Sequence, residues 1–224
     1  MIKTMNINQY KITIYNNSFQ DDIPVVLLNT VHDEGENIWN CCKEFNCPDF
    51  ILVTVSNINW NDDMTPWEYK DSHISCHGQA NKYIDFIKQE LIPELSLNIE
   101  NKMNSYILAG YSLAGLFALY AIYQTNLFDS LAIASGSFWY PDFVEYVKNH
   151  DIKKRPQCIY FSLGNKEKNT KHPYMKYVEQ NTLELVNYYQ NLGIPTVYEE
   201  NQGNHFYQAD ERMAKAIYTV LNQK

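Results

Sequence analysis

Short apolar segments alternate along the chain with longer segments whose apolar residues recur at helical spacing. Residues 25–28 and 50–55 are apolar almost without interruption, as expected of strands buried on both faces of a parallel sheet. Residues 10–15 alternate with period two, which predicts an edge strand. Further strands are predicted at 105–109, 131–134, 158–163 and 196–199, and helices at 34–44, 83–95, 113–123, 174–192 and 206–221. This order predicts an α/β fold, with a doubly wound, mainly parallel sheet and helices on both faces.

Residues 56–78 interrupt this rhythm with a stretch in which we predict no regular element. The length of 224 residues fits one domain, and no repeat, low-complexity tract or linker divides the chain. We therefore expect a single domain over residues 1–224.

The chain carries a formal net charge of −8, and its acidic and basic residues are interspersed. Nucleic acids and anionic membranes bind clustered Lys and Arg, so we expect neither as a partner. No apolar run approaches the roughly 18 residues of a membrane span. No secretory signal is recognisable after Met1, so the expected location is the cytoplasm. The oligomeric state stays open.

The five cysteines are an odd number in a chain large enough to fold without disulfides, which indicates reduced thiols. Cys41, Cys42 and Cys47 lie closest together, but their spacing does not match paired zinc ligands and no histidine completes a set nearby. We interpret these three cysteines as small buried apolar residues and expect no metal.

The most informative motif is Gly110-Tyr111-Ser112-Leu113-Ala114, between a predicted strand and a predicted helix. Strand, Gly-x-Ser-x-small and helix form the pattern of a nucleophile elbow, a sharp turn that exposes the serine hydroxyl. The residues two before and two after the serine must be small, because larger side chains would collide across the turn. Gly110 and Ala114 meet this requirement, although Ala114 departs from the usual glycine. Ser112 is therefore the candidate nucleophile.

Candidate partners of Ser112 follow in the order acid, then histidine, that hydrolases built on such a sheet use. His205 lies after the last predicted strand, where a general base is required. Glu167 follows the strand at 158–163 and is the candidate that orients the imidazole. Weaker candidates for the acid are Asp33, Asp142 and Glu200. The other histidines lie at positions unsuited to the base: His32, His73, His77, His150 and His172. We expect the last two to be exposed, and His73 and His77 to be possible pocket residues.

Acyl transfer also needs N–H groups that bind the developing oxyanion. The first is expected at Leu113, and the second in the loop after residues 25–28, at Thr30 or Val31. For the substrate pocket we select Tyr111 and Trp139, the latter on a loop after a strand's carboxyl end, where open α/β sheets bind ligands. Other aromatic residues of such loops are interpreted as packing residues: Trp60, Trp67, Phe138 and Tyr140.

Four segments resemble the putative esterase family of the α/β-hydrolase superfamily, the group of esterase D and enterochelin-esterase-like proteins. They are residues 110–115, 135–139, 163–167 and 203–206, and the similarity runs over residues 24–221. The resemblance implies an α/β-hydrolase fold with little or no cap domain. It also implies ester hydrolysis through an acyl-enzyme, with Ser112 as nucleophile, His205 as base and Glu167 where the acid is expected.

The reaction that we expect is hydrolysis of a small acyl or aryl ester by a serine esterase. A Ser-His pair activates its own nucleophile, so we expect no cofactor. Two alternatives stay open, a siderophore trilactone esterase and a non-catalytic binding protein on the same fold. The presence of Ser112, His205 and Glu167 together speaks against the second alternative.

Overall fold

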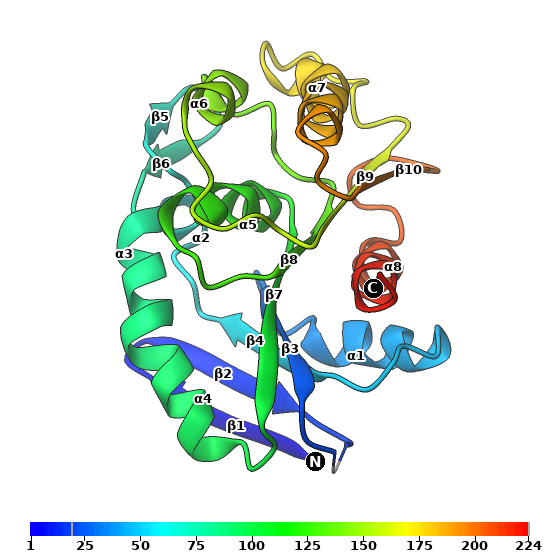
Figure 1. Ribbon diagram of the computed structural model, residues 1–224. Helices are drawn as coiled ribbons and strands as arrows, with labels where there is room; N and C mark the ends of the chain where they lie inside the picture. Colours follow the sequence, from blue (N-terminus) through cyan, green and yellow to red (C-terminus); the bar gives the residue numbers. More distant parts are fainter. Residues whose placement is uncertain (19, 224) are drawn as a thin grey trace.

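The computed structural model describes residues 1–18 and 20–223 and is built on an eight-stranded sheet (Figure 1). Across the sheet the strand order is β1-β2-β4-β3-β7-β8-β9-β10. The strands are β1 (Ile2–Ile7), β2 (Tyr10–Tyr15), β3 (Ile23–Asn29), β4 (Ile51–Ser56), β7 (Met103–Tyr111), β8 (Ser130–Ala134), β9 (Cys158–Gly164) and β10 (Thr196–Asn201). In this spatial order, every neighbouring pair from β4 through β3, β7, β8 and β9 to β10 is parallel, and β2 pairs antiparallel with both β1 and β4. The predicted mainly parallel sheet is confirmed.

Helices cover both faces of the sheet, as predicted, and each face has its own buried apolar cluster. One face carries α1 (Gly35–Glu44) and α8 (Ala209–Leu221), which lie on one side of the sheet in Figure 1. The other face carries α3 (Ala80–Phe86), the π-helical segment η1 (Ile87–Leu91), α4 (Ile92–Asn98), α5 (Leu113–Gln124), α6 (Phe143–Asn149) and α7 (Val178–Asn191). The parallel strands therefore lie between two layers of helices, and the loops at their carboxyl ends lie at the edge of both layers.

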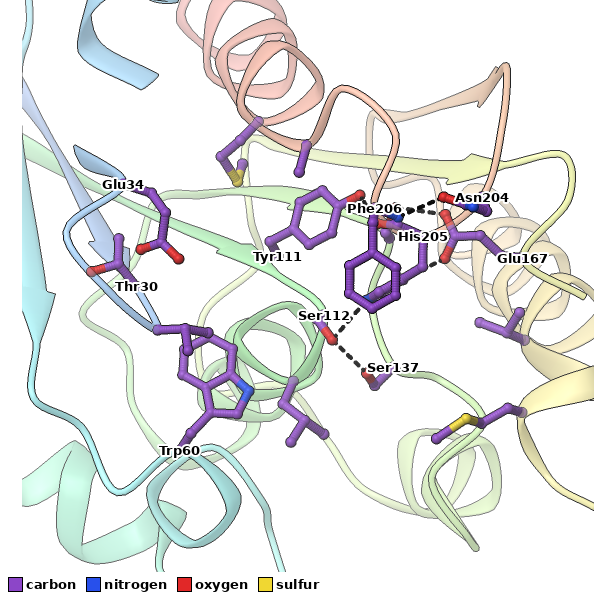
Figure 2. A pocket seen from close by; sticks show the side chains of 18 of the residues that line it. Thr30, Glu34, Trp60, Tyr111, Ser112, Ser137, Glu167, Asn204, His205 and Phe206 are labelled. Carbon is purple, nitrogen blue, oxygen red and sulfur yellow. Dashed lines mark hydrogen bonds and ion pairs between the residues drawn. The ribbon is translucent and has the colours of Figure 1, made fainter. Parts of the chain in front are cut away.

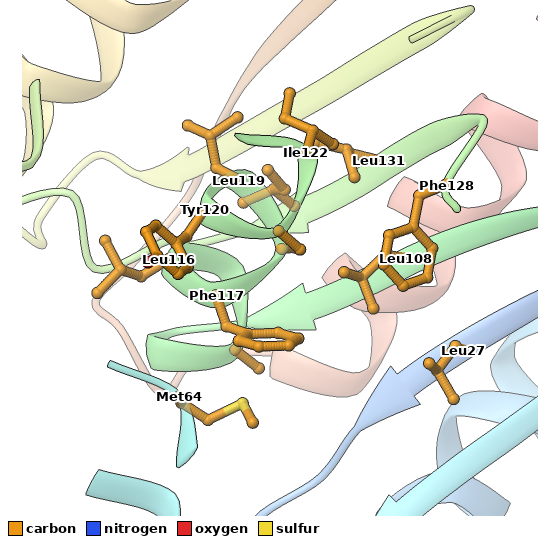
Figure 3. Packing of buried hydrophobic residues seen from close by; sticks show 14 of the residues in the cluster. Leu27, Met64, Leu108, Leu116, Phe117, Leu119, Tyr120, Ile122, Phe128 and Leu131 are labelled. Atoms are coloured by element: carbon orange, nitrogen blue, oxygen red, sulfur yellow. The ribbon is translucent and has the colours of Figure 1, made fainter. Parts of the chain in front are cut away.

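Helix α5 is apolar around its whole circumference, and residues 113–123 are all buried. Its side chains lie in one continuous cluster with residues of β7 and β8 and with Met64, which follows α2 (Trp60–Asp63) (Figure 3). Leu116 and Phe117 leave the helix in different directions, and Leu108 of β7 lies to the right of the helix in the view of Figure 3. This packing fixes the helix that begins directly after Ser112.

Several predicted elements differ from the observed ones. The strand at 10–15 is not an edge strand, because the unpredicted β1 pairs with it along its full length. The stretch 56–78 is not irregular throughout, since it forms α2 (Trp60–Asp63) and a hairpin of β5 (Glu68–Lys70) and β6 (Ser75–His77). The helix predicted at 174–192 begins as the 3-10 turn η2 (Met175–Tyr177), and α6 was not predicted.

Candidate active site

Ser112 occupies a sharp turn between β7 and α5, with φ 58° and ψ −123°. An L-residue rarely adopts this conformation, and the surrounding contacts hold it there. A Cβ on Gly110 would lie 2.2 Å from the carbonyl oxygen of Ala114, so only glycine fits at that position. A Cβ on Gly115 would lie 2.9 Å from Gly136 Cα. The positions where the backbone leaves no room for a Cβ are therefore Gly110 and Gly115. The elbow can accordingly carry an alanine at position 114 in place of the usual glycine.

The side chains of Ser112, His205 and Glu167 form a hydrogen-bonded chain (Figure 2). His205 Nε2 lies 3.0 Å from Ser112 Oγ, and His205 Nδ1 lies 2.7 Å from Glu167 Oε2. The carboxylate accepts only, so Nδ1 carries a hydrogen and Nε2 of the neutral ring accepts the serine proton. The three residues follow β7, β9 and β10, whose carboxyl ends meet at one edge of the sheet.

Glu167 is buried and ionised. Its side chain is 3% exposed, and Oε1 accepts hydrogen bonds from Ser135 Oγ and from the Gly164 N–H, each at 2.7 Å. Burial raises the pKa of this carboxyl, but the hydrogen bond and charge of His205 and the Ser135 and Gly164 donors outweigh it, so the pKa is lowered overall. A charged loop exposed to solvent would not have this environment.

Arg212 of α8 is a buried partner of Glu167 that sequence reasoning missed. It is 4% exposed, and its Nη1 lies 3.3 Å from both Glu167 Oε1 and the Tyr111 hydroxyl. Its Nη2 donates to the Gln202 carbonyl at 2.5 Å. Tyr111 in turn donates to the His205 carbonyl at 2.7 Å. These hydrogen bonds connect the loop between β10 and α8, which carries His205, to β7, which directly precedes Ser112.

The candidate oxyanion donors differ in whether their N–H groups are free. The Thr30 N–H donates to the Val55 carbonyl at 2.9 Å, which removes Thr30 from the two predicted alternatives. Within the described part of the chain, the Leu113 and Val31 N–H groups have no protein acceptor. Leu113 is also the first residue of α5, where the helix dipole favours negative charge. Leu113 and Val31 therefore remain the candidate donors.

A cavity of about 840 Å³ opens beside Ser112 and His205. Its lining is largely apolar, and its apolar residues include Ile38, Trp60, Ile74, Tyr111, Trp139, Met175, Val178, Phe206 and Met213. The two predicted pocket residues, Tyr111 and Trp139, are both among them. Figure 2 shows Trp60 and Glu34 on one side of Ser112 and Glu167 on the other. Trp60 lines the cavity, so its assignment to packing alone is wrong.

The other residues singled out in the sequence lie apart from this chain of hydrogen bonds. His205 Nδ1 bonds to Glu167, whereas the alternative acid Asp33 pairs with Lys11 at 2.8 Å. His150 is exposed, as predicted. The prediction for His172 is wrong, because its side chain is 7% exposed and bonds to Asp71.

All five cysteines are free. Of the three predicted to be buried, Cys42 is buried, whereas Cys41 and Cys47 are partly exposed. Cys76 and Cys158 are also buried. Over residues 1–18 and 20–223, no group of three or more His, Cys, Asp or Glu side chains is arranged to hold a metal ion. None of the helices in these residues is long and apolar enough to cross a membrane.

Comparison with known proteins gives a family match and a set of similar structures. The family model described as "Putative esterase" matches residues 30–211. An IroE-like serine hydrolase from Shewanella oneidensis has a TM-score of 0.77 at 18% identity, over 99% of this chain and 78% of that chain. The siderophore hydrolase EstB from Aspergillus nidulans has a TM-score of 0.70 at 18% identity, over 98% and 94%.

Enterochelin esterase from Shigella flexneri has a TM-score of 0.74 at 14% identity, and the match covers 99% of this chain but 58% of that one. No protein with a curated description matches the sequence. These structural similarities confirm the predicted α/β-hydrolase fold.

Proposed function

The chain belongs to the putative esterase family and is an enzyme that acts on esters, and we propose that Ser112, His205 and Glu167 are its catalytic triad. The proposed reaction is hydrolysis of small acyl or aryl carboxylic esters. One observation carries the proposal. The hydroxyl, imidazole and buried carboxylate are joined by hydrogen bonds of 3.0 Å and 2.7 Å beside the cavity.

In the first half of the reaction Ser112 Oγ attacks the ester carbonyl carbon while His205 Nε2 takes the hydroxyl proton. The Leu113 and Val31 N–H groups bind the carbonyl oxygen as it becomes an oxyanion. Glu167 stabilises the imidazolium without taking its proton. The C–O bond to the alcohol then breaks, the alcohol leaves with the proton from His205, and the acyl group remains on Ser112.

In the second half a water molecule attacks the acyl-enzyme and gives its proton to His205. The tetrahedral intermediate collapses, Ser112 recovers its proton from His205, and the carboxylic acid is released. No step draws on a cofactor. We place the whole mechanism in one domain, residues 1–224, and the free thiols favour a reducing compartment such as the cytoplasm.

The test compares wild type, Ser112→Ala and Ser137→Ala on p-nitrophenyl esters and with a fluorophosphonate label. Ser137 Oγ lies 3.4 Å from Ser112 Oγ and is the nearest competing hydroxyl. We expect Ser112→Ala to lose turnover and label together, and Ser137→Ala to keep the label. Labelling that persists in Ser112→Ala and disappears in Ser137→Ala would assign the nucleophile to Ser137 instead.

A siderophore trilactone is the second candidate substrate, supported by the likeness to the siderophore hydrolase and the enterochelin esterase. A trilactone offers three ester bonds to the same Ser-His pair. Besides Glu167, the cavity lining carries the carboxylates Glu34 and Asp210 and the ammonium group of Lys166, and this excess of carboxylates disfavours an anionic catecholate. Hydrolysis of enterobactin and of a neutral trilactone, compared with p-nitrophenyl butyrate, separates the two substrate classes.

A non-catalytic binding protein on the same fold is the remaining alternative. It predicts no ester turnover and no fluorophosphonate adduct on Ser112. A labelled Ser112 would exclude it even if none of the tested esters were hydrolysed.

A further inference from the structure

Asp71 lies at the turn of the β5–β6 hairpin and accepts four hydrogen bonds. Its Oδ1 accepts from the His73 and Ile74 N–H groups at 2.7 Å and 2.9 Å. Its Oδ2 accepts from the Tyr69 hydroxyl at 2.5 Å and from His172 Nε2 at 2.8 Å. These donors hold the pKa of Asp71 well below its usual value, so the carboxylate is ionised. The turn is therefore closed around one charged group.

His172 is the partner of Asp71 from a distant part of the chain, between β9 and α7. Its Nδ1 accepts from the Tyr174 and Met175 N–H groups, each at 3.3 Å. With Nδ1 accepting, Nε2 carries the hydrogen that is donated to Asp71. The His172 ring centroid lies 5.8 Å from that of Trp139. The imidazole is buried and both of its nitrogens have partners, which makes replacement costly.

The Asp71–His172 contact joins two segments that both line the cavity. Ile74 comes from the hairpin turn and Met175 from the segment after His172, and Trp139 packs beside the imidazole. Each strand of the hairpin has three residues, which is too short for the hairpin to hold its place alone. The Asp71–His172 contact therefore links the hairpin to the segment after β9, in addition to the ring contacts of Tyr69 with Trp139 and Tyr140.

We propose that Asp71 and His172 form a positioning pair that holds Ile74, Trp139 and Met175 as one apolar wall and thereby sets the preference for esters with larger apolar groups. This inference rests on the proposed esterase function. Neither residue touches the reacting atoms. Their effect is on binding of the substrate's apolar group and not on the chemistry at Ser112.

Two substitutions remove the hydrogen bond between Asp71 and His172, and a third partly retains it. His172→Phe keeps a planar ring but removes both nitrogens. Asp71→Asn turns an amide NH2 toward two donors. His172→Gln retains a donor that can reach Asp71. The matched control is His150→Phe, because His150 is an exposed histidine whose Nδ1 contacts the Tyr146 carbonyl at 2.8 Å and which does not line the cavity.

The measurement is kcat/KM for p-nitrophenyl hexanoate relative to p-nitrophenyl acetate, with hexyl acetate as the ester that carries its chain on the alcohol side. We expect His172→Phe and Asp71→Asn to lower the preference for the longer ester about tenfold, through KM, which matches the loss of one charge-assisted hydrogen bond. His172→Gln should recover part of the preference, and His150→Phe should keep the wild-type ratio. An unchanged ratio, or an equal loss on both esters through kcat, would overturn the proposal.

A binding assay tests the pair without catalysis. The inert ether 1-hexyloxy-4-nitrobenzene is titrated into Ser112→Ala with and without His172→Phe, and tryptophan fluorescence reports the Kd. We expect about a tenfold weaker Kd in the double variant, and an equal Kd would refute the positioning role. If wild type hydrolyses no ester, the proposed function fails, and this assay still decides on the pair. Thermal melts identify any variant that does not fold, and Asp71→Asn then replaces His172→Phe.

Discussion

Replacing Arg212 with methionine removes the buried guanidinium that faces the proposed catalytic acid. Arg212 Nη1 lies 3.3 Å from Glu167 Oε1, and both side chains are 3% exposed, so solvent screens the pair little. Methionine retains apolar volume but cannot donate. Glu167 keeps its hydrogen bonds from His205, Ser135 and Gly164.

The cost follows from leaving a charge buried without its partner. Removing one member of a buried ion pair costs about 3–5 kcal/mol. Because Glu167 keeps three hydrogen-bond donors, we expect Arg212→Met to lower the free energy of unfolding by about 3 kcal/mol, the lower end of this range. At about 2–4 °C per kcal/mol for a chain of this size, the Tm falls by about 6–12 °C.

The loss of stability in Arg212→Met depends on pH. In the wild type the lowered pKa of Glu167 stabilises the fold above the unfolded pKa of about 4.3, and this contribution is lost as the pH falls through the folded value. Removing the positive charge of Arg212 raises the Glu167 pKa. The stability deficit of Arg212→Met is therefore larger near pH 7 than near pH 4.

Urea unfolding of wild type and Arg212→Met at both pH values measures this difference. Arg155→Met is the matched control, since Arg155 is exposed and donates to the Leu192 carbonyl at 2.9 Å. It should change stability by no more than about 0.5 kcal/mol. An equal loss of stability for Arg212→Met at both pH values, or an equal loss in a Glu167→Gln background, would show that the ion pair with Glu167 is not the cause.

Three further comparisons of variants test the site. Glu167→Gln should lower kcat by up to about 10⁴-fold and by less than His205→Ala, and equal losses in a kinetic comparison would contradict an orienting role. Gly110→Ala should cost several kcal/mol in urea unfolding, because its Cβ would lie 2.2 Å from the Ala114 carbonyl oxygen, whereas Ala114→Gly should retain a wild-type elbow. Val31→Pro removes the second oxyanion donor and should lower kcat about 10²–10³-fold with a smaller change in KM, and unchanged kcat would assign that donor elsewhere.

The parts of the fold and of the candidate site that can be proposed from the sequence depend on local pattern and chain order. Apolar runs identify the parallel strands because these are buried on both faces. The elbow around Ser112 has a short-range steric signature. Glu167 and His205 are recognisable in the sequence as loop residues after the last two strands. In the structure His205 lies within hydrogen-bond distance of both Ser112 and Glu167.

The parts that the sequence does not reveal depend on contacts between distant segments. A charged residue on an amphipathic helix, such as Arg212, ordinarily faces solvent. Its burial beside Glu167 depends on contacts with distant segments, the Tyr111 hydroxyl and the Gln202 carbonyl. Thr30 could not be separated from Val31, because the distinction lies in a hydrogen bond to Val55. His172 resembles a surface residue until Asp71, 101 positions earlier, lies beside it.

The candidate base and nucleophile belong to parts of the sheet with different resistance to opening. Ser112 follows β7, which has strands on both sides, whereas His205 follows β10, which pairs with β9 alone and is only partly buried. Outer strands open with less free energy than central ones, so amide hydrogen exchange in β10 should be faster than in β7. Mild denaturant would then separate imidazole from hydroxyl before the sheet unfolds, and turnover would be lost reversibly while most secondary structure persists.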